Sequence, residues 1–312
     1  MNHMEEIFMI YTVTLNPAVD YVVRLPRLQM GVANRTLSEE FFFGGKGINV
    51  SLVLRELGVA TTALGLIADF TGAALRADLE RRGIVTDFVE LDAGFTRINV
   101  KIKTEAEETE INGRGPDIPQ TALAALLVRL DRLQTGDTLV LAGSVPGSVP
   151  SDIYEVILSR LAGREIRFVV DAEKKLLLPA LAYRPFLVKP NLRELSDIAG
   201  REFSGDEEIV AAARELQRAG AMNVLVSLGG DGALLLDETG RTHRAPAVGG
   251  RPVNTVGAGD SMVAGFLAGV KGGYDHALRL GLAAGGATAS AVGLGDAATI
   301  EKLLAETKKH RE

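Results

Sequence analysis

The chain has 312 residues, of which 46% are hydrophobic and 24% charged, and its formal net charge is −6. This is the composition of a folded globular protein, and a mildly acidic chain lacks the broad basic surface with which proteins bind nucleic acids. The sequence contains no cysteine, which excludes disulfides, thiolate catalysis and cysteine-based metal sites. The four histidines, His3, His243, His276 and His310, lack the spacing of a metal site.

The N-terminus carries no targeting signal that the sequence reveals. Residues 1–8 are acidic and lack the apolar core of a signal peptide. No apolar run reaches the roughly 20 residues that a membrane helix needs. We therefore expect residues 1–8 to be an extension or tag, residues 9–312 to form a single domain, and the protein to work in the cytoplasm without a membrane partner.

Taken in chain order, apolar runs alternate with helical patterns. Short apolar runs bounded by turn residues predict strands at residues 9–15, 138–142, 167–171, 186–189 and 224–227. Helices are predicted at residues 48–57, 73–82, 121–133, 153–162, 193–199, 207–219, 258–270 and 276–291. Strands that alternate with helices indicate an α/β fold with a mostly parallel sheet, and the continuous apolar runs indicate helices on both faces.

Two regions, residues 19–43 and 96–113, have few helix signals and predict a small antiparallel β lid. Apolar and polar side chains alternate strictly from residue 97, which indicates a strand with its apolar face buried. The polar face carries Arg97, Lys101 and Lys103. This face is either a solvated hairpin surface or the lining of a site for an anionic ligand.

The segment Gly257-Ala258-Gly259-Asp260 opens an apolar helix. Free N–H groups in a first helical turn suit a phosphate or a developing negative charge. An aspartate there would repel a bound phosphate, but it can accept a proton from a hydroxyl that attacks a phosphoryl group. The alternative is an acidic residue that only complements the helix dipole.

A second glycine-rich turn, Gly44-Gly45-Lys46-Gly47, also precedes a helix. It is not a phosphate-binding P-loop, because Glu40 stands where that motif needs glycine and Gly47 where it needs Ser or Thr. Asn49 in the first helical turn suits hydroxyl binding and Lys46 suits charge pairing. The alternative is a capped turn with a solvated lysine.

Two further segments follow predicted strands. Asn191 and Glu194 have the spacing of a helix capping box, although Glu194 also suits Mg²⁺, which prefers oxygen ligands. The run Ser227-Leu228-Gly229-Gly230-Asp231-Gly232 is a glycine-rich strand exit.

In this order and spacing, the four segments resemble the PfkB carbohydrate kinases of the ribokinase-like fold. Residues 254–267 are similar to the C-terminal signature of that family, and residues 44–51 to the start of its N-terminal signature. Residues 12–20 and 96–113 are most similar to members that phosphorylate ketohexose phosphates. The likeness runs from about residue 9 to residue 295.

The resemblance implies a ribokinase-like three-layer α/β/α sandwich and a kinase that uses ATP and Mg²⁺. The expected substrate is D-fructose 1-phosphate, phosphorylated at its 6-hydroxyl to give fructose 1,6-bisphosphate. Tagatose 6-phosphate and fructose 6-phosphate stay open, because nothing in the residues distinguishes a phosphate at C1 from one at C6.

The resemblance also implies residue roles. Asp260 is the expected general base, with Gly257, Ala258 and Gly259 as the anion hole. Asp20 and Asn49, together with Gly45, are expected at the sugar, and Glu194 at Mg²⁺ through water. The residues expected at ATP are Lys189, Asn191, Ser227, Gly229, Gly230, Asp231, Gly232 and Gly259.

A substrate that already carries a phosphate requires converging cations. Arg97 and Lys46 are the leading candidates, followed by Arg35, because arginine binds phosphate through two hydrogen bonds and lysine as a point charge. An exposed lid sheet also predicts a homodimer in which two lids cover each other.

Overall fold

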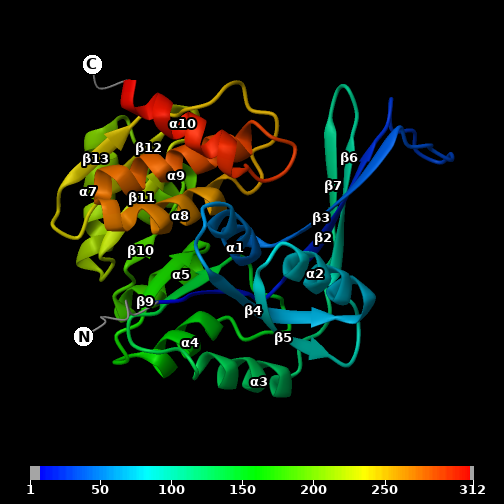
Figure 1. Ribbon diagram of the computed structural model, residues 1–312, viewed down its shortest axis with the longest axis horizontal. Coiled ribbons are helices and arrows are strands. Elements are labelled where there is room, and N and C mark those ends of the chain that lie inside the picture. Colours follow the sequence, from blue (N-terminus) through cyan, green and yellow to red (C-terminus); the bar gives the residue numbers. More distant parts are fainter. Residues whose placement is uncertain (1–7, 310–312) are drawn as a thin grey trace, which may run out of the picture.

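The computed structural model describes residues 8–309 and contains a nine-stranded sheet between two layers of helices (Figure 1). The strands are β1 (Ile10–Thr14), β4 (Thr61–Ala68), β5 (Val85–Leu91), β8 (Thr138–Ala142), β9 (Arg167–Asp171), β10 (Leu187–Val188), β11 (Asn223–Ser227), β12 (Ala233–Leu236) and β13 (Thr242–Ala245). Their order across the sheet is β13-β12-β11-β10-β9-β8-β1-β4-β5. Neighbouring strands are parallel except at β11/β12 and β12/β13, which pair antiparallel.

Helices cover both faces of this sheet. One face carries α1 (Lys46–Glu56), α2 (Asp69–Arg81), α8 (Ala258–Gly269), α9 (Tyr274–Ala289) and α10 (Ala297–Lys309). The other carries α3 (Gln120–Leu130), α4 (Ile153–Leu161), α5 (Lys174–Ala180), α6 (Leu192–Ala199) and α7 (Asp206–Arg218). Short 3-10 turns occupy Leu181–Tyr183, Gly229–Asp231 and Val270–Gly272. Among residues 8–309, none of the helices combines the length and the apolar character needed to span a bilayer.

The strand sequences explain this layering. All five residues of β8 are buried, with Leu141 packed among the helices of one layer and Val140 among those of the other. A strand that is apolar on both faces needs helices on both sides to exclude water. The predicted α/β sandwich with a mostly parallel sheet is therefore confirmed.

The sequence pattern located the central strands better than the peripheral elements. β8 and β9 have the bounds that their apolar runs predict, and β1, β10 and β11 differ by one or two residues at an end. The elements that the pattern did not predict are β4, β5, β12, β13, α5 and α10. Most of these are short or lie at the edges of the fold.

A second sheet of four strands projects from the body as a lid (Figure 1). It contains β2 (Ala18–Arg24), β3 (Ser38–Gly44), β6 (Arg97–Lys103) and β7 (Glu108–Asn112), in the order β3-β2-β6-β7. The outer pairs β2/β3 and β6/β7 are antiparallel, whereas β2 and β6 pair parallel at the centre.

In β6 the polar face is more deeply buried than the apolar face, the reverse of what the sequence predicts. Asn99 and Lys101 are buried, while Val100 and Ile102 are only half-buried. The expectation that the apolar face is the buried one is therefore wrong. The reason is that the polar face of the lid turns toward the body and covers a cavity, whereas the apolar face turns away.

Candidate active site

The predicted site residues gather where the parallel strands end. β9 ends at Asp171, and Lys189 follows β10 directly. The N-termini of α1 and α8 lie at the same edge, because Lys46 contacts Asp171 and a side chain added at Gly259 would meet Lys189. Ligands of open α/β sheets bind at this carboxyl edge.

The first turn of α8 has the conformation that an anion hole requires. Gly257 is the N-cap, with φ = +80°, in the left-handed region that favours glycine. A side chain at this position would also come within 2.8 Å of Leu294 Cδ2. The N–H groups of Gly259 and Asp260 have no helical carbonyl one turn earlier, so they are available to a phosphoryl oxygen.

Asp260 is buried in this turn, with 5% of its surface exposed, and accepts a hydrogen bond from Asn49 Nδ2 at 2.8 Å. Burial, reinforced by the negative charge of Asp171, raises the pKa of Asp260 to about 6. A carboxylate with such a pKa is ionised at neutral pH and still basic enough to accept a proton from a hydroxyl in the transition state.

Asn49 is placed by the glycine turn before α1. Gly45 has φ = +131°, and a side chain there would come within 2.6 Å of Thr14 Cγ2. A side chain at Gly44 would come within 2.9 Å of Asn49 Oδ1. These glycines let α1 begin against β1, so that Asn49 reaches Asp260.

Lys46 and Lys189 converge on one carboxylate. Lys46 Nζ lies 3.1 Å from Asp171 Oδ1, and Lys189 Nζ lies 3.5 Å from Asp171 Oδ2. Burial by itself would raise the pKa of Asp171, but the charges of Lys189 and Lys46 hold it below its ordinary value. The pKa of Lys46 is raised above its ordinary value. Burial would lower this pKa, but the charge of Asp171 outweighs the effect of burial. We call Lys46, Asp171, Lys189 and Asp260 the charge cluster.

Sequence reasoning missed Asp171. It ends a continuous apolar run and belongs to no motif. The one available signal was its place, because a carboxylate at the end of a central parallel strand faces the ligand edge.

A cavity of about 370 Å³ lies between the lid and the body. Asp20, Gly45 and Asn49, which the resemblance places at the sugar, line it. Its walls also include Arg24, Lys101 and Lys103 from the lid and Arg55 and Arg82 from the body. Asn49 lines this cavity and also donates to Asp260, which is not itself among the lining residues, so Asn49 connects the cavity to Asp260.

Two lid residues that sequence reasoning did not assign to the site hold Asp20 in place. Asn99 Nδ2 donates to Asp20 Oδ1 at 2.8 Å, and Lys101 Nζ lies 2.9 Å from Asp20 Oδ2. Asn99 Oδ1 in turn accepts from Gly113 N at 3.2 Å. The alternation of β6 put both residues on the polar face, and the structure shows that this face supports the site.

The two candidate arginines differ in position. Arg97 shares the cavity-facing side of β6 with Asn99, and its Nε is buried with no hydrogen-bond partner in the described part of the chain. Burial lowers the pKa of Arg97, and the charge of Asp20 opposes this shift. Arg35 is exposed in the connection between β2 and β3, and neither Arg35 nor Arg97 is among the residues that line the cavity.

The predicted ATP side also comes together. Ser227 forms a parallel bridge with Asn191, and its N–H donates to Pro190 O at 3.2 Å. The glycine turn follows directly, with Gly229 and Gly232 at φ = +59° and +93°. Thus the strand exits after β10 and β11 form one surface beside the charge cluster.

Asn191 and Glu194 form a capping box at the start of α6. Asn191 Oδ1 accepts from Glu194 N, and Glu194 Oε2 accepts from Asn191 N, both at 2.8 Å. The negative charge of Glu194 also contributes to the raised pKa of Lys46, so this carboxylate lies within electrostatic reach of the cluster.

No group of three or more acidic or histidine side chains among the described residues is arranged to hold a metal ion. A Mg²⁺ ion that travels with nucleotide phosphates keeps several waters and needs only one or two carboxylates. The carboxylate of Glu194 is half-buried and accepts a hydrogen bond from Asn191 N through Oε2, and a single carboxylate of this kind fits that requirement.

Comparison with known proteins adds independent findings. A family model described as pfkB family carbohydrate kinase matches residues 12–301. The chain is 44% identical over 305 residues to the 1-phosphofructokinase of Bacillus subtilis (strain 168), covering 97% of this chain and 100% of that protein. It is 39% identical over 301 residues to the D-tagatose-1-phosphate kinase of Bacillus licheniformis, covering 96% and 98%.

Solved structures agree with the fold. Phosphofructokinase-2 from Escherichia coli, in complex with substrates and products, superimposes with a TM-score of 0.90 at 30% identity, covering 96% of this chain and 99% of that chain. A ribokinase from Thermotoga maritima superimposes with a TM-score of 0.77 at 19% identity, covering 96% and 99%.

Proposed function

Because the chain belongs to the PfkB family of carbohydrate kinases, we propose that it transfers the γ-phosphoryl group of ATP to the 6-hydroxyl of D-fructose 1-phosphate. The products are ADP and fructose 1,6-bisphosphate. The observation that carries this proposal is the position of Asp260, buried at the start of α8 and bonded to Asn49, which lines the cavity under the lid.

The proposed reaction assigns one proton transfer to the protein. The hydroxyl oxygen forms a bond to the γ-phosphorus while the bond from that phosphorus to the β,γ-bridging oxygen breaks. Asp260 accepts the hydroxyl proton, and Asn49 keeps the accepting carboxylate oriented through its 2.8 Å hydrogen bond. General-base help of this kind contributes about 10²–10⁴-fold to a rate.

The turn formed by Gly257, Ala258 and Gly259 is proposed to stabilise the charge that develops on the phosphoryl oxygens, through the N–H groups of Gly259 and Asp260. Ala258 N donates to Thr255 O at 3.2 Å in this structure. Donors that are fixed before the reaction act strongly in a buried site, because they need not reorient. Lys189 adds a positive charge beside Gly259, where a side chain would come within 3.1 Å of Lys189 Nζ.

The ATP side is formed by the strand exits at Lys189 to Asn191 and Ser227 to Gly232, with Asp231 in the glycine turn. Glu194 would hold Mg²⁺ through its waters. When bound, the ion neutralises part of the negative charge of the nucleotide phosphates.

On the sugar side, Asp20 and Asn49 are proposed to bind hydroxyls, with Gly45 allowing close approach. Arg97 is proposed to bind the phosphate that the sugar already carries, since its buried Nε lacks a hydrogen-bond partner among the described residues. Lys46 lies at the transfer end of the site, against Asp171. Arg35 keeps only a supporting role, because in this structure it lies away from the cavity.

A second candidate substrate is D-tagatose 1-phosphate, which the 39% identity to a D-tagatose-1-phosphate kinase favours. The two sugars differ only in the configuration at C4. The decisive experiment compares kcat/KM for fructose 1-phosphate, tagatose 1-phosphate, fructose 6-phosphate and tagatose 6-phosphate, with ADP formation as the readout.

We expect the highest kcat/KM for fructose 1-phosphate, and a preference for any of the other sugars would reject this substrate assignment. Arg97→Ala should raise KM for the sugar phosphate and leave KM for ATP unchanged. An unaltered KM for the sugar phosphate would remove Arg97 from the phosphate site.

We also propose that two copies pair through their lids. The outward face of the lid carries one apolar residue from each strand in register: Phe41, Tyr21, Val100 and Ile111. The rings of Tyr21 and Phe41 stack at 4.7 Å, and Phe41 and Ile111 are 60% and 58% exposed. A contiguous apolar face of this kind is typical of an interface. A related structure is described as a tetrameric inhibited form of phosphofructokinase-2.

Light scattering tests the pairing. We expect the mass of two chains for the wild type and of one chain for Phe41→Asp. Val128→Asp, at an exposed apolar position on α3, is the matched control and should keep the wild-type mass. A monomeric wild type at working concentration would reject the lid pairing.

A further inference from the structure

Asp171 stands out in the charge cluster because two lysines share it. Its side chain is 1% exposed, and that of Lys189 is 5% exposed, whereas Lys46 keeps 39% of its side chain exposed. One carboxylate thus lies between two ammonium groups, and Asp260 is the second carboxylate near them.

The backbone fixes the place of this carboxylate. Asp171 is the last residue of β9, which pairs with β8 on one side and β10 on the other. Its carbonyl accepts from Gly143 N at 3.1 Å, and Tyr154 Oη donates to Gly143 O at 3.1 Å. The position of Asp171 is therefore set by the centre of the sheet rather than by a mobile loop.

Both ammonium groups lie close to the first turn of α8. Lys189 Nζ lies 3.1 Å from the point that a Cβ of Gly259 would occupy. Lys46 and Lys189 are each close enough to Asp260 for their charges to lower its pKa, against the raising effects of burial and of Asp171. The two cations therefore lie where a phosphoryl group held by this turn would meet them.

We infer that Asp171 is a positioning residue for phosphoryl transfer, holding the ammonium groups of Lys46 and Lys189 at the transfer site. This inference rests on the proposed function. Asp171 itself touches neither the hydroxyl nor the phosphoryl group, and acts through the two lysines.

Charge balance gives the arrangement a chemical consequence. With both carboxylates ionised, the two lysines and two aspartates cancel. When Asp260 takes the proton of the attacking hydroxyl, one positive charge remains uncompensated. That charge arises when negative charge is spread over the oxygens of the transferring phosphoryl group, which it stabilises.

The competing explanation is structural: a buried lysine needs a counter-ion, and Asp171 merely neutralises Lys189. Under that explanation Asp171→Asn destabilises the fold and shifts the pKa of Asp260, but leaves the maximal kcat unchanged for the folded enzyme. The two explanations therefore differ in a kinetic measurement.

The test compares Asp171→Asn with the wild type and with Asp131→Asn, a control at an exposed ion pair with Arg160. We expect Asp171→Asn to lower kcat by about 100-fold, the scale for loss of one preorganised charge-stabilising group. The acid limb of the pH profile should move to lower pH, because Asp260 loses the neighbour whose charge raises its pKa. Asp131→Asn should change neither quantity.

A double-mutant cycle with Lys46→Met asks whether Asp171 acts through Lys46. Residues that act as a unit are not additive, so the double variant should lose less than the product of the two single losses. Full additivity, or a wild-type maximal kcat in folded Asp171→Asn, would overturn the inference.

If Asp171→Asn does not fold, kcat values of variants at the half-exposed Lys46 test the inference instead. Lys46→Met should lower kcat while Lys46→Arg, which can keep the ion pair, restores part of it. Equal kcat in the wild type and Lys46→Met would then overturn the inference. A wild type inactive on every sugar phosphate rejects the proposed function and this inference with it, whereas an active wild type with an unaffected Asp171→Asn rejects the inference alone.

Discussion

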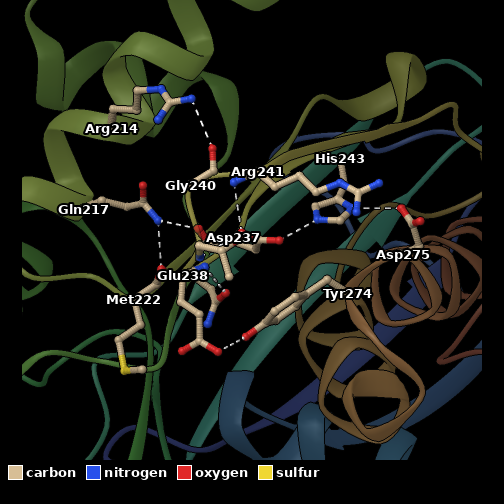
Figure 2. Close-up of polar contacts among 12 residues, drawn as sticks. Arg214, Gln217, Met222, Asp237, Glu238, Gly240, Arg241, His243, Tyr274 and Asp275 are labelled. Carbon is tan, nitrogen blue, oxygen red and sulfur yellow. Dashed lines mark hydrogen bonds and ion pairs between the residues drawn. The ribbon is translucent and has the colours of Figure 1, made fainter.

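Two groups of buried charges in this protein differ in how completely they satisfy each other. One is the charge cluster, in which Asp171 lies between two lysines. The other surrounds His243, whose Nδ1 and Nε2 lie 2.8 Å from Asp275 Oδ1 and Asp237 Oδ2 (Figure 2). In each group a central side chain lies between two polar partners: Asp171 between two lysines, and His243 between two aspartates.

In the His243 network, both carboxylate oxygens of the buried Asp237 have hydrogen-bond partners. Asp237 Oδ1 accepts from the backbone and hydroxyl of Thr239, at 2.9 and 2.7 Å, and from Arg241 N at 3.0 Å. Asp237 Oδ2 faces His243. Burial would raise the pKa of Asp237, but its hydrogen bonds from His243 and Thr239 hold it below its ordinary value. The network fastens the turn between β12 and β13 to the start of α9.

The charge cluster is not saturated. Asp171 Oδ2 has no hydrogen bond within the described residues, only the 3.5 Å ion pair with Lys189, and Lys46 is half-exposed to the cleft. Native proteins satisfy nearly all buried polar groups, so an unsatisfied group beside a cleft marks a place where stability alone does not explain the arrangement. The comparison separates a network whose polar groups are satisfied within the fold from a cluster in which Lys46 is open to the cleft.

The largest expected effect comes from Asp260→Asn. Loss of the general base should lower kcat by about 10²–10⁴-fold with little effect on KM. Because burial raises the pKa of Asp260, its ionised form is disfavoured in the fold, so the amide should leave the melting temperature unchanged or raise it. Near-normal kcat would remove Asp260 from the base role.

His243→Gln should lower the stability of the fold and leave kcat unchanged, the opposite of what we expect for Asp260→Asn. Removing the imidazole leaves the buried Asp237 without one of its hydrogen-bond partners, which should cost about 1.5–3 kcal/mol in the free energy of unfolding. Denaturant unfolding measures this loss. kcat of the folded variant should equal that of the wild type, since Gly232, at the end of the glycine turn, and Asp237 are separated by the length of β12, about 16 Å of strand. A lowered kcat would show that the two groups are coupled.

pH should separate the two groups in the wild type. The raised pKa of Asp260 means that kcat/KM rises with pH through about 6. The folded state binds the extra proton of Asp260 between its ordinary value near 4 and about 6, so this group's contribution to stability falls as pH rises through that window. The depressed pKa of Asp237 acts in the reverse sense: its contribution is present above about 4 and is lost as pH falls below it.

These pH effects need two measurements on one preparation. A pH–rate profile locates the acid limb, and unfolding free energies across the same range report stability. In Asp260→Asn, the decline in stability from about pH 4 to 6 should be weaker than in the wild type. An unchanged decline would mean that another group carries it.

The sequence predicted the parts of the site that backbone conformation encodes. Gly257 and Gly45 adopt positive φ and allow close approach of the backbone. Positions with these requirements are usually occupied by glycine, so they can be recognised in the sequence. The strands β8 and β9 were equally visible, because they are apolar runs between turn residues.

The rest depends on three-dimensional convergence. Lys46 and Asp171 are 125 positions apart, and no local pattern links them. The alternation in β6 could not say which face is buried, because a polar face that covers a cavity is as buried as an apolar face in a core. His243 lacks metal-site spacing, yet its partners Asp237 and Asp275 come from a turn and a helix that the sequence pattern did not place beside each other.

The smallest expected effect is that of Tyr274→Phe, at the edge of the His243 network (Figure 2). Tyr274 Oη donates to Glu238 Oε1 at 2.6 Å, and its ring packs against Phe266 and His243. Phenylalanine keeps the ring and removes only a partly exposed hydrogen bond, so the unfolding free energy should fall by about 1 kcal/mol or less. kcat and its pH profile should match the wild type. If the acid limb moved in this variant, the His243 network would influence Asp260 through α8, which carries both Asp260 and Phe266, and the two groups could no longer be treated as independent.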